Sequence, residues 1–175
     1  MGSADVVETT QYLTFTLGEE EFALDIAKVR EVLDYISITK VPRMPEYLRG
    51  VINLRGNVVP VVDLRMKLGM AAIEKTVNTC IVIVEIERDD EVVQMGALTD
   101  SVQEVMDLDH RQVEPPPRLG INIQTEFIKG MGKRDDKFII ILDIDKVLSE
   151  EEFKEAREMA EGRGAPAVDG DRLAA

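Results

Sequence analysis

Short runs of alternating apolar and polar residues fill most of the chain and predict β-strands. Leu13, Phe15 and Leu17 alternate with Thr14 and Thr16, which is the two-residue period of a half-buried strand. Comparable runs, separated by polar or glycine-bearing turns, occupy residues 22–26, 28–35, 50–54, 58–62, 80–86, 92–98, 102–107 and 138–142. Many short strands without long helices are typical of small β-barrels, so we predict a mainly all-β fold.

One segment near the C-terminus has a different pattern and predicts a helix. Ser149, followed by Glu152 three residues later, forms the sequence pattern of a capping box. We therefore expect a short C-terminal helix over residues 149–161, which glycines then end. The flanking segments 1–10 and 162–175 lack an apolar pattern, and we expect both to be disordered tails.

The chain also contains an internal repeat. Residues 46–50 (Glu-Tyr-Leu-Arg-Gly) return as Glu-Phe-Ile-Lys-Gly at an offset of 80 residues, and residues 29–34 return at an offset of 73. A repeat of this kind means two similar subdomains. We expect two five-stranded β-barrels, over about 11–75 and about 76–148, and the pattern leaves open an exchange of strands between them.

Composition narrows the classes of function. The 175 residues carry a net charge of −13, whereas proteins that bind nucleic acid or anionic membranes cluster lysine and arginine. The charge favours a protein whose partners are proteins. Cys80 is the single cysteine, so no internal disulfide can form and a reducing compartment is expected. Because we find no signal-peptide pattern and no apolar run of membrane-spanning length, we expect a cytoplasmic protein without membrane insertion.

No arrangement of residues typical of catalysis occurs. The single histidine, His110, lies in a charged stretch and is interpreted as a solvated loop residue. One histidine and one cysteine cannot form a zinc site, and the acidic runs 19–21 and 89–91 lack the ligand spacing of a calcium loop. No nucleophile elbow, phosphate-binding loop or dinucleotide fingerprint is present. We expect no enzymatic activity, no cofactor and no metal.

Three segments resemble the bacterial chemotaxis coupling protein family, CheW. They are residues 12–18 leading into 22–32, residues 50–64 and residues 127–130. The most specific part is Gly-Val-x-Asn-Leu-Arg-Gly-x-x-x-Pro-Val-x-Asp-Leu, at 50–64. The resemblance covers about 11–148 and implies two SH3-like five-stranded barrels, in agreement with the repeat. It also implies a non-enzymatic adaptor that joins the cytoplasmic hairpin of chemoreceptors to the chemotaxis histidine kinase in membrane-associated arrays.

The resemblance further implies which residues meet the receptor. The motif arginine of the family falls on Arg55, with Glu31 as its pairing partner. Val29 and Gly50 would line the same groove, with Cys80 at its border. The residues alone leave other interpretations open: a solvated turn arginine, an outward-facing strand carboxylate, and a glycine kept in both repeats because a side chain would block a close approach.

A second contact is implied for the regulatory domain of the kinase. The resemblance places it on the proline-rich loop from Glu114 to Leu119, where the family often has a basic residue and an aromatic one. On the residues alone, this loop can equally be a stiff connector.

Two other functions remain as alternatives. The first is a β-barrel protein that binds peptides or sugars. The second is an oligonucleotide-binding barrel, which the negative charge and the 5% content of aromatic residues argue against, because such sites need cations and stacking rings.

Overall fold

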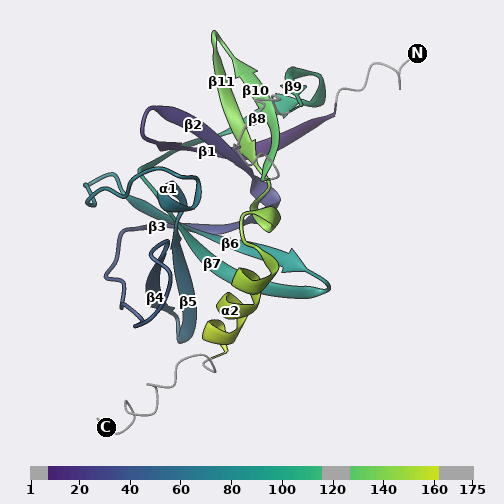
Figure 1. The fold of residues 1–175 in the computed structure, drawn as a ribbon. Helices are drawn as coiled ribbons and strands as arrows, with labels where there is room; N and C mark the ends of the chain where they lie inside the picture. Colours follow the sequence, from purple (N-terminus) through teal and green to yellow (C-terminus); the bar gives the residue numbers. More distant parts are fainter. Residues whose placement is uncertain (1–7, 116–126, 162–175) are drawn as a thin grey trace, which may run out of the picture.

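The computed structural model describes residues 8–115 and 127–161, and their strands form two sheets (Figure 1). In spatial order, the six-stranded sheet contains β8 (Ser101–Asp109), β1 (Thr9–Leu17), β2 (Glu20–Asp25), β11 (Lys137–Leu142), β10 (Ile128–Arg134) and β9 (Val113–Glu114). The five-stranded sheet contains β3 (Val29–Asp34), β6 (Cys80–Arg88), β7 (Glu91–Thr99), β5 (Asn57–Asp63) and β4 (Leu48–Leu54). The predicted mainly all-β fold is confirmed.

Each sheet takes strands from both halves of the chain. The N-terminal hairpin β1–β2 pairs with β8 and β11, whereas β6 pairs with β3 and β7 pairs with β5. Each sheet therefore combines strands from before and after residue 75. The chain crosses from the five-stranded to the six-stranded sheet at Asp100, between β7 and β8.

The internal repeat appears as a repeated sheet topology. The order β3-β6-β7-β5-β4 has the same pattern as β8-β1-β2-β11-β10, with β5 parallel to β7 and β11 parallel to β2. Both copies shift register immediately before a glycine, Gly50 or Gly130. The backbone N–H of Asp63 donates to the carbonyl of Tyr47 at 2.7 Å, and that of Asp143 donates to Phe127 at 2.8 Å.

The buried apolar residues form three clusters. The largest joins the two sheets and includes Leu13, Phe15, Leu17, Phe22, Leu24, Val82, Val84, Ile86, Val93, Met95 and Ala97. A second lies within the five-stranded sheet and contains Ile52, Leu54, Val59, Val61, Ile81 and Ile83. A third lies within the six-stranded sheet and contains Tyr12, Ala23, Leu108, Ile139 and Ile141. Because β6 contributes alternate residues to the first two clusters, both of its faces are buried, which explains its continuous apolar sequence.

The predicted C-terminal helix is present as α2 (Glu150–Ala160) and packs on β5 and β7. The hydroxyl of Ser149 accepts from the N–H of Glu152 at 3.1 Å, and the Glu152 carboxylate accepts from the N–H of Ser149 at 2.8 Å. These reciprocal bonds form the expected capping box. The buried residues of α2 are Phe153, Ala156 and Met159.

The other helical segments of the described residues are short. η2 (Ile26–Lys28), α1 (Leu64–Lys67) and η3 (His110–Gln112) lie between strands, and η4 (Ile144–Lys146) lies between β11 and α2. In the described part of the chain, no helix has both the length and the apolar character that a membrane crossing requires.

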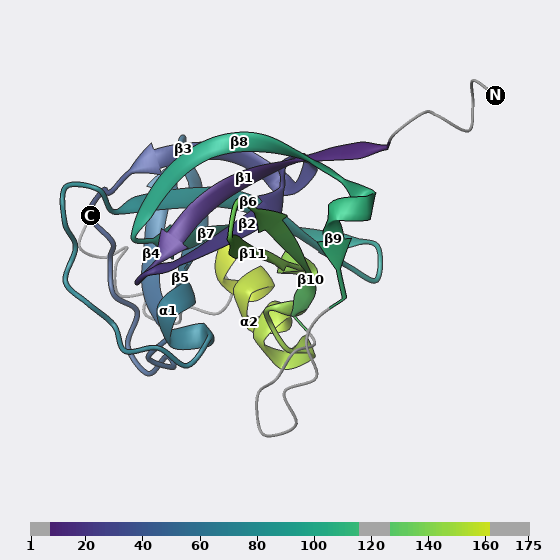
Figure 2. The same ribbon diagram turned by 90° about the horizontal axis from the view of Figure 1, so that it is seen from above.

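The predicted N-terminal tail ends earlier than expected. Thr9 already pairs with Asp109 of β8, so residues 9 and 10 begin a strand rather than end a tail. From above, β1 and β8 run side by side as long curved strands (Figure 2). Residues 1–7 and the predicted tail 162–175 lie outside the described residues.

Candidate functional site

The hairpin between β4 and β5 presents Arg55 at its tip. Arg55 and Gly56 have φ angles of 51° and 88°, and positive values at both central residues are the requirement of a two-residue type I′ turn. The N–H of Gly56 donates to the side-chain oxygen of Asn53 at 2.8 Å, which stabilises the turn. A left-handed conformation is unfavourable for arginine. The turn nevertheless holds this side chain outward, with 69% of it exposed.

Glu31 pairs with Arg55 and so connects the two outer strands of the five-stranded sheet. The Nη2 group of Arg55 donates to the Oε1 atom of Glu31, and this bond raises the pKa of Arg55. Glu31 lies on β3 and Arg55 follows β4, and these are the two outer strands of the sheet. The predicted pair is confirmed as a contact, and it brings the two edges of the sheet together.

Gly50 is buried and permits a close approach of two backbone segments. Its φ angle is 138°, and a Cβ atom there would lie 2.1 Å from the carbonyl oxygen of Thr39. Thr39 and Val51 exchange two backbone hydrogen bonds, of 2.8 and 2.9 Å. In the second copy, a Cβ on Gly130 would lie 3.0 Å from the carbonyl oxygen of Glu114. Both glycines therefore serve a close approach, and Gly50 can shape the surface only through its backbone.

Val29 and Cys80 lie at opposite ends of the β3–β6 pairing. Val29 pairs with Val84 and packs against the central cluster, whereas Cys80 pairs with Asp34. The Cys80 thiol donates to the carbonyl of Asn78 at 3.4 Å, and burial raises its pKa. A raised pKa keeps the thiol protonated and unreactive at neutral pH. Of the five predicted receptor residues, the structure brings Glu31 and Arg55 into contact, and it places Val29 on β3, Gly50 on β4 and Cys80 on β6.

Glu114 lies in the other sheet. It belongs to β9, the outermost strand of the six-stranded sheet, and its side chain is 52% exposed and 3.8 Å from the Nζ atom of Lys133. Leu119 and the rest of the proline-rich loop beyond residue 115 lie outside the described residues. The predicted receptor and kinase residues that the structure describes thus lie in separate sheets.

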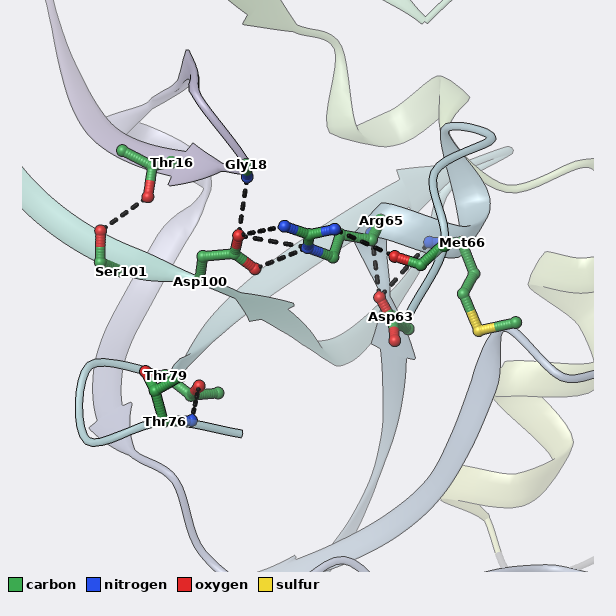
Figure 3. A network of polar contacts seen from close by, with 10 residues as sticks. Thr16, Gly18, Asp63, Arg65, Met66, Thr76, Thr79, Asp100 and Ser101 are labelled. Carbon is green, nitrogen blue, oxygen red and sulfur yellow. Dashed lines mark hydrogen bonds and ion pairs between the residues drawn. The ribbon is translucent and has the colours of Figure 1, made fainter. Parts of the chain in front are cut away.

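Sequence reasoning missed a polar network that connects the sheets (Figure 3). The guanidinium of Arg65, in α1, binds both carboxylate oxygens of Asp100, with Nε to Oδ1 at 2.9 Å and Nη2 to Oδ2 at 2.8 Å. The N–H of Gly18, in the β1–β2 turn, donates to the same carboxylate at 2.7 Å. Burial alone raises the pKa of Asp100, but the bonds from Arg65 and Gly18 outweigh it and leave that pKa below its usual value. No sequence pattern connects residues so far apart.

A second glutamate–arginine pair was also missed, although the repeat could have indicated it. Glu104 stands 73 residues after Glu31, and its Oε2 atom lies 2.5 Å from the Nη2 group of Arg134 at the end of β10. In the first pair the arginine is the more exposed partner, 69% against 30%. In the second pair the glutamate is the more exposed partner, 51% against 35%. The partner that is more exposed to solvent therefore differs between the two pairs.

The described residues contain no candidate metal site. Among them, no group of three or more His, Cys, Asp or Glu side chains could hold a metal ion. His110 opens η3 and is 55% exposed, and its Nε2 atom lies 2.9 Å from the Thr10 hydroxyl. These contacts are those of a surface residue.

Comparisons with known proteins agree with this geometry. The profile of the CheW-like domain matches residues 11–152. The chemotaxis protein CheW of Klebsiella aerogenes is 36% identical over 143 residues, which cover 82% of this chain and 84% of the relative. The CheW protein of Thermotoga maritima is 34% identical over 155 residues, which cover 87% of this chain and 96% of the relative.

A solved structure extends the similarity to the fold. The crystal structure of the scaffolding protein TtCheW from Thermoanaerobacter tengcongensis is 41% identical, with a TM-score of 0.69, and the match covers 77% of this chain and 89% of that one. The two sheets and the short C-terminal helix fit the expected SH3-like fold. The chain belongs to the CheW-like domain family.

Proposed function

We propose that this chain is a non-enzymatic chemotaxis adaptor, which couples the cytoplasmic hairpins of chemoreceptors to the chemotaxis histidine kinase. Its family and its chemotaxis relatives support this function, as does its similarity to TtCheW, which is a scaffolding protein. The observation that carries the proposal is the exposed Arg55 held by Glu31 at the edge of the five-stranded sheet.

Arg55 is the contact that we assign to the receptor. A guanidinium has five N–H donors in a planar fork, and the bond to Glu31 engages one of its terminal nitrogens. The pair contributes little to stability because Arg55 is largely exposed. Its role is to hold the arginine in one orientation, which reduces the conformational entropy lost on binding. Val29, Gly50 and Cys80 shape the surface around it.

The kinase contact lies on the other sheet. Glu114 is exposed on β9 and close to Lys133, so this edge presents a charged surface to the regulatory domain of the kinase. We also assign Leu119, which lies outside the described residues, to this kinase contact. A protein that binds the receptor through one sheet and the kinase through the other joins the two physically. We therefore place its action in the cytoplasm, at membrane-associated receptor arrays.

The test is kinase autophosphorylation in a mixture of the protein, a receptor cytoplasmic fragment and the kinase. We expect activity to change only when all three are present. Arg55→Glu should abolish this effect, whereas Lys146→Glu should keep it. Lys146 is a matched control because it is an exposed cation (62%) near a carboxylate, on η4. Kinase activity that is the same with and without the protein would support the peptide- or sugar-binding alternative instead.

A further inference from the structure

An ion pair holds the segment through which the chain enters β3. The chain passes from the six-stranded to the five-stranded sheet at η2, and none of the three residues of η2 is buried. The last of them, Lys28, pairs with Asp145 of η4, with 2.9 Å between Nζ and Oδ2. Both side chains are largely shielded from solvent, at 24% and 30% exposed. The pair therefore ties the start of β3 to the segment that follows β11.

Asp145 is itself held firmly by its neighbours. Its Oδ1 atom accepts from the N–H of Glu87, near the end of β6, at 2.9 Å. Its own N–H donates to the Asp143 side chain at 3.2 Å. The guanidinium of Arg88 donates to the carbonyl of Asp145, with Nε at 3.0 Å, and also to the carbonyl of Leu148. Asp145 is thus a fixed anchor for Lys28.

The internal repeat contains a second residue in the place of Asp145. Arg65 stands 80 residues earlier, which is the offset of the repeat. Asp63 ends β5 and Asp143 directly follows β11. The N–H of Arg65 donates to the Asp63 carboxylate at 3.0 Å, as the N–H of Asp145 does to Asp143. The two residues therefore occupy equivalent positions and carry opposite charges.

Each of these two residues fixes a strand at the point where the chain changes sheets. Arg65 binds Asp100, directly before β8, and Asp145 binds Lys28, directly before β3. In both junctions the carboxylate also accepts from a backbone N–H of a neighbouring hairpin. Strands β3 and β8 are outermost in their sheets, so each has a neighbouring strand on one side within its sheet. Each junction therefore holds one end of an outer strand.

Strand β3 carries two of the residues assigned to the receptor. Val29 directly follows Lys28, and Glu31 holds Arg55. We propose that Asp145 is a positioning residue for the receptor surface: through Lys28 it fixes the start of β3, so that this end need not be ordered when the receptor binds. Its role is exerted through Lys28, and we assign it no contact with the receptor. This assignment rests on the proposed function.

The test measures the affinity of the receptor cytoplasmic fragment for the full-length protein by calorimetry. Asp145→Asn keeps an oxygen that can accept from Glu87 and removes the charge that attracts Lys28. It should weaken binding about three- to tenfold, the range expected when one long side chain has to be immobilised on binding. Lys28→Met keeps most of the stem and should have the same effect. The double variant should bind no more weakly than either single variant, because all three lose the same contact.

Asp100→Asn is the matched control, because it breaks the equivalent junction at β8, which carries no residue assigned to the receptor. The side chains of Arg65 and Asp100 are the less exposed pair, at 15% and 19%, so this variant should lose more in thermal midpoint than Asp145→Asn. It should nevertheless bind the receptor fragment as the wild type does. A purely structural role of the junctions would give the opposite order, with the less stable variant binding more weakly.

The outcomes separate this inference from the proposed function. If Asp145→Asn and Lys28→Met bind the fragment normally while Arg55→Glu does not, the inference is wrong and the adaptor function stands. If Asp145→Asn and Asp100→Asn weaken binding equally, both junctions serve stability alone, and the inference is overturned. If the wild type does not bind the fragment, the inference and the proposed function are both wrong.

Discussion

At the scale of single residues, two glycines of the β4–β5 hairpin, Gly50 and Gly56, have different roles. Both have positive φ angles, but a Cβ on Gly50 would collide with the Thr39 backbone, whereas one on Gly56 would meet nothing within 4 Å. Gly56 therefore serves the conformation of the turn alone. Gly50 serves both its conformation and the close approach of the Thr39 segment.

We predict that Gly50→Ala lowers the free energy of unfolding by roughly 3 kcal/mol, from backbone strain and from displacement of Thr39. Gly56→Ala should cost only about 1 kcal/mol, because it adds strain without a collision. Denaturant unfolding of the two variants measures both values. Equal losses of unfolding free energy in the two variants would show that the Thr39 backbone moves away from the added Cβ atom at no cost. Because substitution of Gly50 is expected to destabilise the fold, loss of receptor binding in a Gly50 variant is informative only if circular dichroism shows that the variant is folded.

The pair Glu31 and Arg55 allows a test of orientation against charge. Arg55→Glu and Glu31→Arg should each fold normally and fail to support kinase activation in the three-component assay. If Glu31 only orients the arginine, the exchange of both charges should restore part of the activity. If the receptor recognises the positive charge at 55, the double variant should stay inactive.

A double-mutant cycle on receptor affinity gives the coupling between the two side chains. Zero coupling, with both single variants fully active, would identify Arg55 as a solvated turn residue and remove the central assignment.

At the scale of elements, the strands were predictable but their partners were not. The alternation at residues 13–17 and the repeat at an offset of 80 located β1, β4, β5, β10 and β11, because local pattern determines them. The pairing of β6 was not predictable. Apolar residues fill both of its faces, so several partner strands would bury it equally well. The contact between Arg65 and Asp100 likewise depends on where the chain crosses between the sheets, which no local pattern encodes.

The candidate site was predicted in part. The turn arginine and the strand glutamate came from a specific motif, and the structure confirms their contact. The pair Glu104 and Arg134 was missed because the arginine is displaced by one position from the exact repeat of Arg55.

Helix α2 contributes to stability through its buried face. Phe153 is 5% exposed within the cluster that joins the sheets, and the guanidinium of Arg88 lies 5.9 Å from its ring centre. Phe153→Ala should lower the free energy of unfolding by about 3 to 4 kcal/mol through lost burial and a residual cavity. Lys154→Ala, the exposed neighbour on the same helix, should change it by less than about 0.5 kcal/mol. Similar values for the two variants in denaturant unfolding would mean that α2 is not part of the cooperative fold.

At the scale of the whole molecule, Asp100 connects the two sheets. Its carboxylate binds the N–H of Gly18 from the six-stranded sheet and the guanidinium of Arg65, in α1, which follows the five-stranded sheet. The side chains of Arg65 and Asp100 are only 15% and 19% exposed, so solvent weakens this bridge less than the pair at Arg55. The bridge complements the apolar cluster, because its directional bonds fix how the sheets are placed relative to each other.

The bridge predicts a specific dependence of stability on pH. Because the folded state lowers the pKa of Asp100, its stabilising contribution is complete above the pKa in the unfolded chain, near 4. As the pH falls through the lower folded value, the unfolded chain binds the extra proton first, and the contribution is lost. Asp100→Asn should therefore be less stable than the wild type at pH 7, by roughly 2 kcal/mol for a charged hydrogen bond, and this difference should shrink below about pH 4.

Asp89→Asn changes an exposed carboxylate in the β6–β7 turn, and its difference from the wild type should stay small and constant over the same range. Urea unfolding at several pH values measures both differences, and a difference for Asp100→Asn that does not change with pH would show that the carboxylate charge does not hold the two sheets together.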